Sequence, residues 1–235
     1  MSAYASPAMR QALGDALRPG GLTSTREALD RVPLAPDSVV LDAGCGPGRT
    51  AAFLQEEVRC RVIGLDRNEV FPQPCPQSGP DFVRGDAGSL PLSPNCLDAI
   101  FCECVLSLLS MPEQGLIEFN RVLKPGGLLY LSDVYARSTS ALPAAPTEAT
   151  CLAAPVSLET WKKRLCSCEF RIVSEQDQTW LIRQTAGRLI FEYGSLQLFW
   201  QAVLGPAAGR VCAARIKDIR PGYVSFVAIK DKSHE

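Results

Sequence analysis

The sequence lacks several features that define common classes of protein. It has one histidine, His234, so a histidine general base or a histidine-rich metal site has no other candidate. No run of apolar residues approaches the ~18 that cross a membrane. The first 20 residues also lack the apolar stretch of a secretion signal. These absences predict a cytoplasmic protein with no membrane partner.

Charge of either sign is not concentrated anywhere in the chain. The 24 Lys and Arg residues nearly balance the 25 Asp and Glu residues, and the formal net charge is −1. Nucleic acids and anionic membrane surfaces are bound by blocks of basic residues, which this sequence does not contain. We therefore expect no nucleic-acid partner and favour a small-molecule or metalloid substrate.

Cysteine, in contrast, is plentiful, with 10 residues in a chain of 235. None of them shows the paired Cys-x-x-Cys spacing that is typical of structural zinc sites, so we predict no metal site. In a reducing compartment most of these residues are expected to be free thiols.

The most informative segment combines a short apolar run, Val39 to Ala43, with glycines at positions 44, 46 and 48. Such glycines let the backbone turn tightly and approach a bound molecule, and the residues from Arg49 onward predict a helix. A dinucleotide fingerprint would need glycine in place of Arg49, and a P-loop would need a following Gly-Lys-Ser/Thr that is absent. The loop therefore predicts a cofactor site of another kind.

Four further segments follow in order. The second predicted strand ends in Asp66, 18 positions after Gly48, close to the ~20-residue spacing of a ribose-binding acid in nucleotide folds. The segments are Arg61–Asp66, Val83–Ala87, Leu97–Phe101 and the turn Arg121–Gly127 before an apolar run at Leu128–Leu131.

In this order the segments resemble the motifs of the class I S-adenosylmethionine (SAM) dependent methyltransferases. The resemblance implies an α/β, Rossmann-like fold whose seven-stranded sheet is mostly parallel, with strand seven antiparallel. It also implies SAM as the cofactor, with Asp66 accepting both ribose hydroxyls and with Asp86 and Ala87 at the adenine. The predicted cofactor-binding residues are Asp42, Gly44, Cys45, Gly46, Gly48, Asp66, Arg67, Asp86, Ala87 and Cys102.

We expect a single domain with three parts. Residues 1–35 read as a helical lid, 36–135 as the cofactor-binding core and 136–235 as a substrate-side loop, helices and last strands. In the third part, Ser138–Pro155 is expected to be the substrate-side loop, and Ser157 is an N-cap candidate. The segment Thr185–Leu204 is rich in helix signals, and the last two strands are expected at Phe170–Val173 and Gly222–Ile229.

The fourth predicted strand leads into Cys102-Glu103-Cys104, where two thiols flank a carboxylate. Side chains alternate along a strand with a period of two, so extended geometry points Cys102 and Cys104 to the same side. Ligands of open α/β sheets lie at the carboxyl ends of the strands. This segment is therefore a candidate for the substrate side of the site.

At this point the resemblance narrows to the arsenite methyltransferases, which carry an Asn-Cys-Val-Ile-Asn-Leu run where this chain has Glu103 to Leu108. Those enzymes also have a cysteine that opens a small-residue stretch after strand five, and Cys151 looks like that site. The resemblance implies catalytic roles for Cys104 and Cys151 as metalloid-binding thiols, with Glu103 beside them. Arsenite methyltransferases also have a further cysteine ahead of the glycine loop, and this chain has no cysteine between Met1 and Asp42.

A soft trivalent arsenic centre prefers thiolates, and its lone pair can attack the sulfonium methyl without a general base. Alignment of the reacting atoms would then be the main contribution of the protein. Two other functions stay open. One is a methyltransferase for carbon, oxygen or nitrogen of a small metabolite, with Glu103 or Tyr135 as base or orienting group. The other is a SAM-binding sensor or assembly factor without catalysis.

Overall fold

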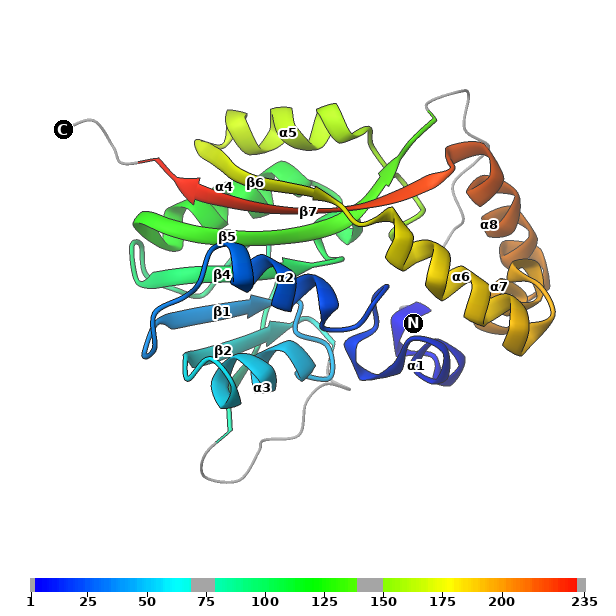
Figure 1. Ribbon diagram of the computed structural model, residues 1–235, viewed down its shortest axis with the longest axis horizontal. Helices are drawn as coiled ribbons and strands as arrows, with labels where there is room; N and C mark the ends of the chain where they lie inside the picture. Colours follow the sequence, from blue (N-terminus) through cyan, green and yellow to red (C-terminus); the bar gives the residue numbers. More distant parts are fainter. Residues whose placement is uncertain (1–2, 69–78, 139–149, 232–235) are drawn as a thin grey trace.

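A computed structural model describes residues 3–68, 79–138 and 150–231 of the chain. Its centre is a seven-stranded sheet in the order β3-β2-β1-β4-β5-β7-β6. Strands β1 to β5 pair in parallel, and β7 runs antiparallel to both β5 and β6 (Figure 1). The predicted fold class, including the antiparallel seventh strand, is confirmed.

The strands are β1 Val39–Ala43, β2 Arg61–Asp66, β3 Asp81–Arg84, β4 Leu97–Glu103, β5 Leu123–Ala136, β6 Phe170–Asp177 and β7 Pro221–Lys230. The α-helices are α1 Pro7–Leu13, α2 Thr23–Arg31, α3 Arg49–Glu56, α4 Pro112–Val122, α5 Leu158–Ser167, α6 Thr179–Tyr193, α7 Leu196–Leu204 and α8 Pro206–Ile219. Short 3-10 turns lie at η1 Ala3–Ala5, η2 Gly14–Ala16 and η3 Leu106–Leu108.

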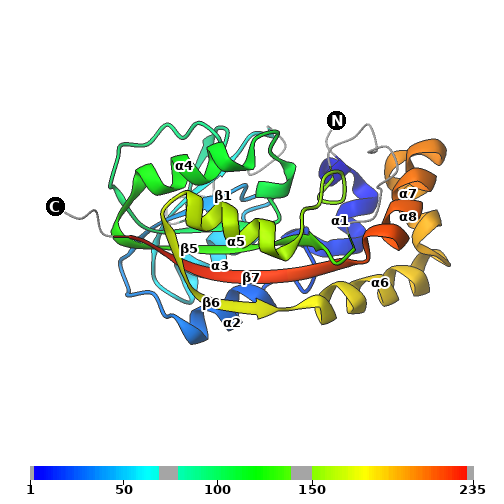
Figure 2. The same ribbon diagram turned by 90° about the horizontal axis from the view of Figure 1, so that it is seen from above.

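The central strands are buried on both faces, as parallel strands with continuous apolar sequences usually are. On one face, α4 and α5 bury Phe119 and Trp161 against a cluster that includes Leu41 and Ile100. On the other face, α2 and α3 cover a cluster that includes Val40 and Phe101 (Figure 2). Alternation along β4 thus sends neighbouring residues to opposite sides of the sheet.

Helices α6, α7 and α8 connect β6 to β7 and stand beyond the carboxyl ends of β1 and β4, next to α1 (Figure 1). Their boundaries follow local chemistry. Gly194 ends α6 in the left-handed region, Ser195 caps α7 through a hydrogen bond from the Leu198 N–H, and Pro206 opens α8. The sequence predicted helix at 185–204, whereas the helical segment runs from 179 to 219 with two breaks.

A second apolar cluster joins these helices to the N-terminal segment. It includes Met9, Cys104, Leu189, Phe199 and Tyr223, which come from α1, the end of β4, α6, α7 and β7. The N-terminal residues are therefore packed onto the same end of the sheet as α6 to α8.

The reversal of strand order lies between β1 and β4, which pair directly although β2 and β3 intervene in the sequence. The crevice at such a reversal is where open α/β sheets bind ligands. Most of the predicted substrate-side loop at 138–155 lies outside the described residues. In the part that the structure describes, no helix is long and apolar enough to cross a membrane.

The close crossing of α7 and α8 depends on Gly209. A Cβ at this position would overlap the backbone of Trp200 and Gln201. Backbone atoms cannot move to relieve the overlap in the way that a flexible side chain can. We expect Gly209→Ala to lower the free energy of unfolding by about 1–3 kcal/mol through overpacking. Urea unfolding followed by circular dichroism measures this.

Gly187 is the matched control, because it lies within α6 and a Cβ there would meet nothing within 4 Å. Gly187→Ala should raise the free energy of unfolding by roughly 0.5–1 kcal/mol, since alanine loses less backbone entropy in a helix. Equal stability of the two variants would contradict the close crossing.

Candidate active site

The glycine loop after β1 forms one wall of a cleft at the carboxyl ends of β1 and β4. Gly44 has φ of +74° and Gly46 has φ of +50°, a region that favours glycine. A Cβ on Gly44 would also collide with the side chain of Val105, just beyond β4. Glycine at this position therefore serves both the turn and the close packing of the two strand ends.

Asp66, the last residue of β2, faces this loop and is fixed by hydrogen bonds. Its Oδ2 accepts from the Gly46 N–H at 3.0 Å, and its Oδ1 accepts from the Asn68 N–H at 2.8 Å and the Asn68 amide at 3.0 Å. The side chain is only half-buried and lines the cleft. Its carboxylate is thus held in one place and open on one side.

Asp86 and Ala87 continue the same wall after β3. The Oδ1 of Asp86 accepts from the Gly88 N–H at 2.7 Å, while Ala87 is buried. Cys45 and Arg67 also line the cleft. Burial raises the pKa of the Cys45 thiol, so this cysteine is a neutral part of the wall.

Asp42, at the floor of the cleft, is a buried acid with an unused acceptor. Its Oδ2 has no hydrogen-bond partner among the described residues. Burial, reinforced by the nearby Glu103, raises the pKa of Asp42 to about 7. A buried orphan acceptor is costly, so this atom fits a bound ligand that brings a donor.

Two predicted cofactor residues do not line the cleft. Cys102 is fully buried among the residues beneath α4 and α5, in the same cluster as Ile100. The strand β4 ends at Glu103, and Cys104 takes a left-handed conformation with φ of +58°. The period of two therefore breaks, and Cys102 and Cys104 lie in different clusters. Gly48 instead starts α3 with φ of +80°, where a Cβ would meet the ring of Phe82.

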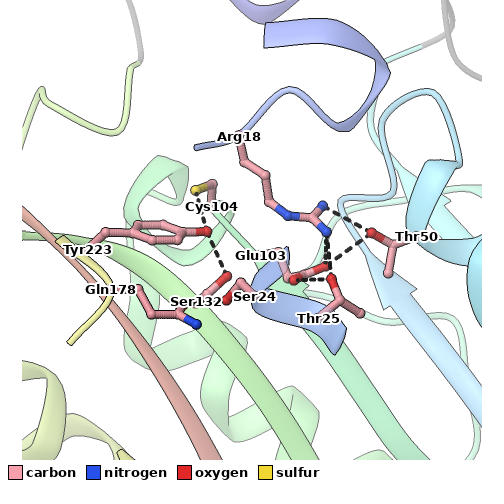
Figure 3. A network of polar contacts seen from close by, with 9 residues as sticks. All are labelled: Arg18, Ser24, Thr25, Thr50, Glu103, Cys104, Ser132, Gln178 and Tyr223. Carbon is pink, nitrogen blue, oxygen red and sulfur yellow. Dashed lines mark hydrogen bonds and ion pairs between the residues drawn. The ribbon is translucent and has the colours of Figure 1, made fainter. Parts of the chain in front are cut away.

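A buried polar network joins the N-terminal segment to the floor of the cleft (Figure 3). Arg18 Nη2 lies 2.8 Å from Glu103 Oε2, and both side chains are 6% exposed. Arg18 also donates to Thr50 and Thr25, at 3.0 and 2.7 Å. These two threonines in turn donate to the two Glu103 oxygens, at 3.1 and 2.9 Å. The network ties residue 18, α2, α3 and β4 together.

This network changes the predicted role of Glu103. Both of its carboxylate oxygens are occupied, one by an ion pair, so the side chain positions the N-terminal segment and is not a free base. Tyr135, the other candidate base, packs its ring against Gly222 and donates to Asp177 at 3.1 Å, away from the cleft. That role for Tyr135 is wrong.

Beyond the cleft lies a second hollow, an apolar cavity of about 390 Å³ between the N-terminal segment and helices α6 to α8. Tyr4, Leu17 and Cys104 line both the cleft and this cavity. Cys151 also lines the cavity, and its N–H donates to the Tyr4 hydroxyl at 3.2 Å. The two cysteines predicted to bind a metalloid, Cys104 and Cys151, thus line the same cavity.

Burial keeps these groups protonated. It raises the pKa of Cys151 to about 12 and the pKa of Cys104 well above its usual range. The Cys104 thiol donates to the hydroxyl of Tyr223 at 3.6 Å, and that hydroxyl shares a hydrogen bond with Ser132 at 2.9 Å (Figure 3). In the described part of the chain, no group of three or more His, Cys, Asp or Glu residues is arranged to hold a metal ion.

Sequence reasoning missed the contribution of the N-terminal segment to the site. Tyr4, Leu17 and Arg18 all line the cleft, as does Thr50 on α3. No motif marks the first three, because their positions depend on how a short irregular segment folds back over the sheet. The expectation of a lid over residues 1–35 was the only available signal.

Comparison with known proteins agrees with this geometry. Residues 41–131 match the family described as "Methyltransferase domain". A methyltransferase of Bacillus subtilis, YodH, named as uncharacterised, is 32% identical over 117 residues, which cover 47% of this chain and 49% of that protein. The chain therefore spans about half the length of the curated relatives it matches.

Solved structures match over most of the chain. The cyclase SpnF is 25% identical with a TM-score of 0.70, covering 89% of this chain and 81% of that one. Phosphoethanolamine N-methyltransferase 2 of Haemonchus contortus, in complex with S-adenosylhomocysteine, has a TM-score of 0.76 at 18% identity. It covers 96% of this chain and 56% of that one, and shows the shared fold.

The fold is that of the Rossmann-like methyltransferases. Residues 41–131 are thus similar to a methyltransferase domain, and a structure that shares the fold of this chain is in complex with S-adenosylhomocysteine. The narrower resemblance to arsenite methyltransferases stays a prediction.

The Arg18–Glu103 pair predicts a large coupling in stability. We expect Arg18→Met to lower the free energy of unfolding by about 3–5 kcal/mol, because it leaves a buried carboxylate without its cation. The double variant Arg18→Met/Glu103→Gln should recover part of that loss. Urea unfolding of the wild type, both single variants and the double variant completes the cycle.

Lys162→Met supplies the control, because Lys162 pairs with Glu159 and Glu175 at the surface, at 3.3 and 3.0 Å. Its loss should change stability by no more than about 1 kcal/mol. If Arg18→Met is as mild as this control, the network does not hold the N-terminal segment.

Proposed function

We propose that this protein is a SAM-dependent methyltransferase whose acceptor is a small molecule held in the cavity behind Cys104. The main observation in support of the proposal is the wall that the cleft and the cavity share. Tyr4, Leu17 and Cys104 border both the cleft and the cavity, so a donor in one and an acceptor in the other would meet there.

The cleft residues suit the proposed cofactor. The fixed carboxylate of Asp66 would accept from the ribose hydroxyls, and the orphan Oδ2 of Asp42 would accept from the amino group of the methionine end, directly or through water. The glycine loop lines the same cleft, so its backbone would lie against that end. Asp86 and Ala87 would lie at the adenine.

The charge of the cleft also suits SAM as the proposed cofactor. Its described lining holds four carboxylates, those of Asp42, Asp66, Asp86 and Glu103, against the two guanidinium groups of Arg18 and Arg67. When bound, SAM supplies a methyl group on a positively charged sulfonium. A cleft with excess negative charge favours that cation, even though Arg18 pairs with one of the four carboxylates, that of Glu103.

The described lining of the cavity contains no carboxylate or imidazole. We infer that the acceptor atom attacks without a general base from the cavity wall. The contribution of the protein is then to exclude water and to align the two reactants, which is worth up to roughly 7–11 kcal/mol at ideal geometry.

Cofactor binding provides the direct test. S-adenosylhomocysteine, titrated into the full chain by calorimetry, should bind, and Asp66→Ala should weaken it about tenfold or more through the loss of charge-assisted hydrogen bonds. Asp81→Ala is the control, because Asp81 is exposed at the opposite end of the sheet, where β3 begins. Absence of binding to the wild type would overturn the cofactor assignment.

Methyl transfer must be measured separately, because a neighbour of this fold is named as a cyclase. Binding of S-adenosylhomocysteine with no transfer to any of a broad panel of acceptors would favour a non-catalytic SAM-binding protein.

A second candidate acceptor is trivalent arsenic, and the shared cavity of Cys104 and Cys151 favours it. Arsenite can condense with two thiols to form two sulfur–arsenic bonds and release two waters, so neutral thiols suffice. The arsenic lone pair would then take the methyl group. An apolar cavity of about 390 Å³ is larger than this acceptor needs, which is why we place it second.

Under this second proposal, arsenite-dependent transfer in the presence of reduced glutathione should fall at least about 100-fold in Cys104→Ser and in Cys151→Ser, since hydroxyls are poor ligands for a soft centre. Binding of S-adenosylhomocysteine should be unchanged. Cys166→Ser, an exposed thiol on α5, should keep full turnover. Turnover that survives both substitutions would exclude arsenic as the acceptor at these thiols.

A further inference from the structure

The cavity behind Cys104 has a composition that narrows the class of acceptor. Its volume of about 390 Å³ falls in the range of about 300–1,000 Å³ that holds drug-sized ligands. The walls are mostly apolar, with Leu189, Phe199 and Trp200 on one side and Met9 and Leu13 on the other. Such walls would bury an apolar body of several carbon atoms.

Every charged side chain in the described lining is an arginine. These residues are Arg137, Arg183 and Arg220, and all three are exposed, so they stand where the cavity meets solvent. The cavity is therefore apolar inside and cationic at its mouth, the reverse of the acidic cleft beside it.

The fold brings these arginines together from three separate segments. Ala136 of β5 pairs with Pro221 of β7 in the antiparallel ladder, and Arg137 and Arg220 extend this pair by one residue. Arg183 comes from α6, which leads away from β6 next to β7. Like charges placed opposite one another across strands destabilise the fold unless a counter-charge is present.

No ion pair supplies such a counter-charge in the described part of the chain. None of the three arginines forms an ion pair within 4.0 Å there. Asp177 lies near enough to Arg137 for an electrostatic attraction, but its oxygens accept from the Tyr135 hydroxyl at 3.1 Å and the Thr179 N–H at 2.8 Å. The guanidinium groups thus keep donors available for a ligand.

We propose that the acceptor is an apolar organic acid, with its anionic group at Arg137, Arg183 and Arg220 and its apolar body in the cavity. This inference rests on the proposed function only for the role of that molecule as acceptor. The end of the body that reaches Cys104 would present the atom to be methylated, because that residue also borders the cofactor cleft. Arginine suits this recognition, since its planar fork binds a carboxylate through two parallel hydrogen bonds.

Octanoate and octanamide are suitable probes, because they share shape and size and differ in charge. Calorimetry on the full chain with saturating S-adenosylhomocysteine should show octanoate binding at least about tenfold more tightly than octanamide. Arg183→Gln and Arg137→Gln should each weaken octanoate by about tenfold and leave octanamide unchanged. Arg210→Gln, on the exposed side of α8 and outside the cavity lining, is the matched control.

A second variant tests the location. Ala186 lines the cavity on α6, so Ala186→Trp should fill the space and abolish octanoate binding while the variant keeps its circular dichroism spectrum. Equal binding of the two probes, no binding of either, octanoate binding unaffected by the arginine substitutions, or binding that survives Ala186→Trp would each overturn the inference.

The binding of S-adenosylhomocysteine alone, measured first, separates the two proposals. If it does not bind, the methyltransferase proposal fails, and octanoate titrated into the protein alone still tests the cavity. If it binds and octanoate does not, only the acceptor class is wrong.

Discussion

The ion pair between Arg18 and Glu103 is the contact on which the arrangement of the site depends. It fixes the N-terminal segment against the carboxyl end of β4, with Thr25 and Thr50 each hydrogen-bonded to both Arg18 and Glu103. Two buried charges cost several kcal/mol each in desolvation, and the ion pair with its four hydrogen bonds offsets that cost, although Arg18 Nε has no partner among the described residues. With Arg18 in place, Leu17 and Tyr4 are brought to the wall between cleft and cavity.

This wall separates the cleft from the cavity, two neighbouring spaces of opposite character. The cleft is lined by more carboxylates than guanidinium groups, which suits a cationic cofactor, whereas the cavity is apolar with arginines at its mouth. Cys104 stands between them because its left-handed backbone turns the chain at the end of β4. Binding of a soft arsenic centre would require the Cys104 thiol, whereas binding of an organic acid would require the arginines at the mouth of the cavity. The thiol substitutions and the arginine substitutions therefore test different chemistry.

The cleft residues proposed to bind the cofactor could be predicted because they lie in short motifs at the ends of strands. Asp66 ends β2 and Asp86 lies just beyond β3, and the sheet fixes both strand ends, so sequence order alone puts the two residues on one edge. The expected pairing of Cys102 with Cys104 failed for a local reason. The expectation of two thiols on one side assumed that β4 continues to residue 104, and the strand ends one residue earlier.

The sequence by itself determined the fold class and identified eight residues of the cleft as candidates for cofactor binding, because hydrophobic periodicity and glycine placement act over a few residues. Only the tertiary structure decided the acceptor side. Arg137, Arg183 and Arg220 lie on three separate segments, and Arg18 lies 85 positions before its partner Glu103. Such contacts depend on how distant segments pack at the end of the sheet, and no local pattern of residues encodes that packing.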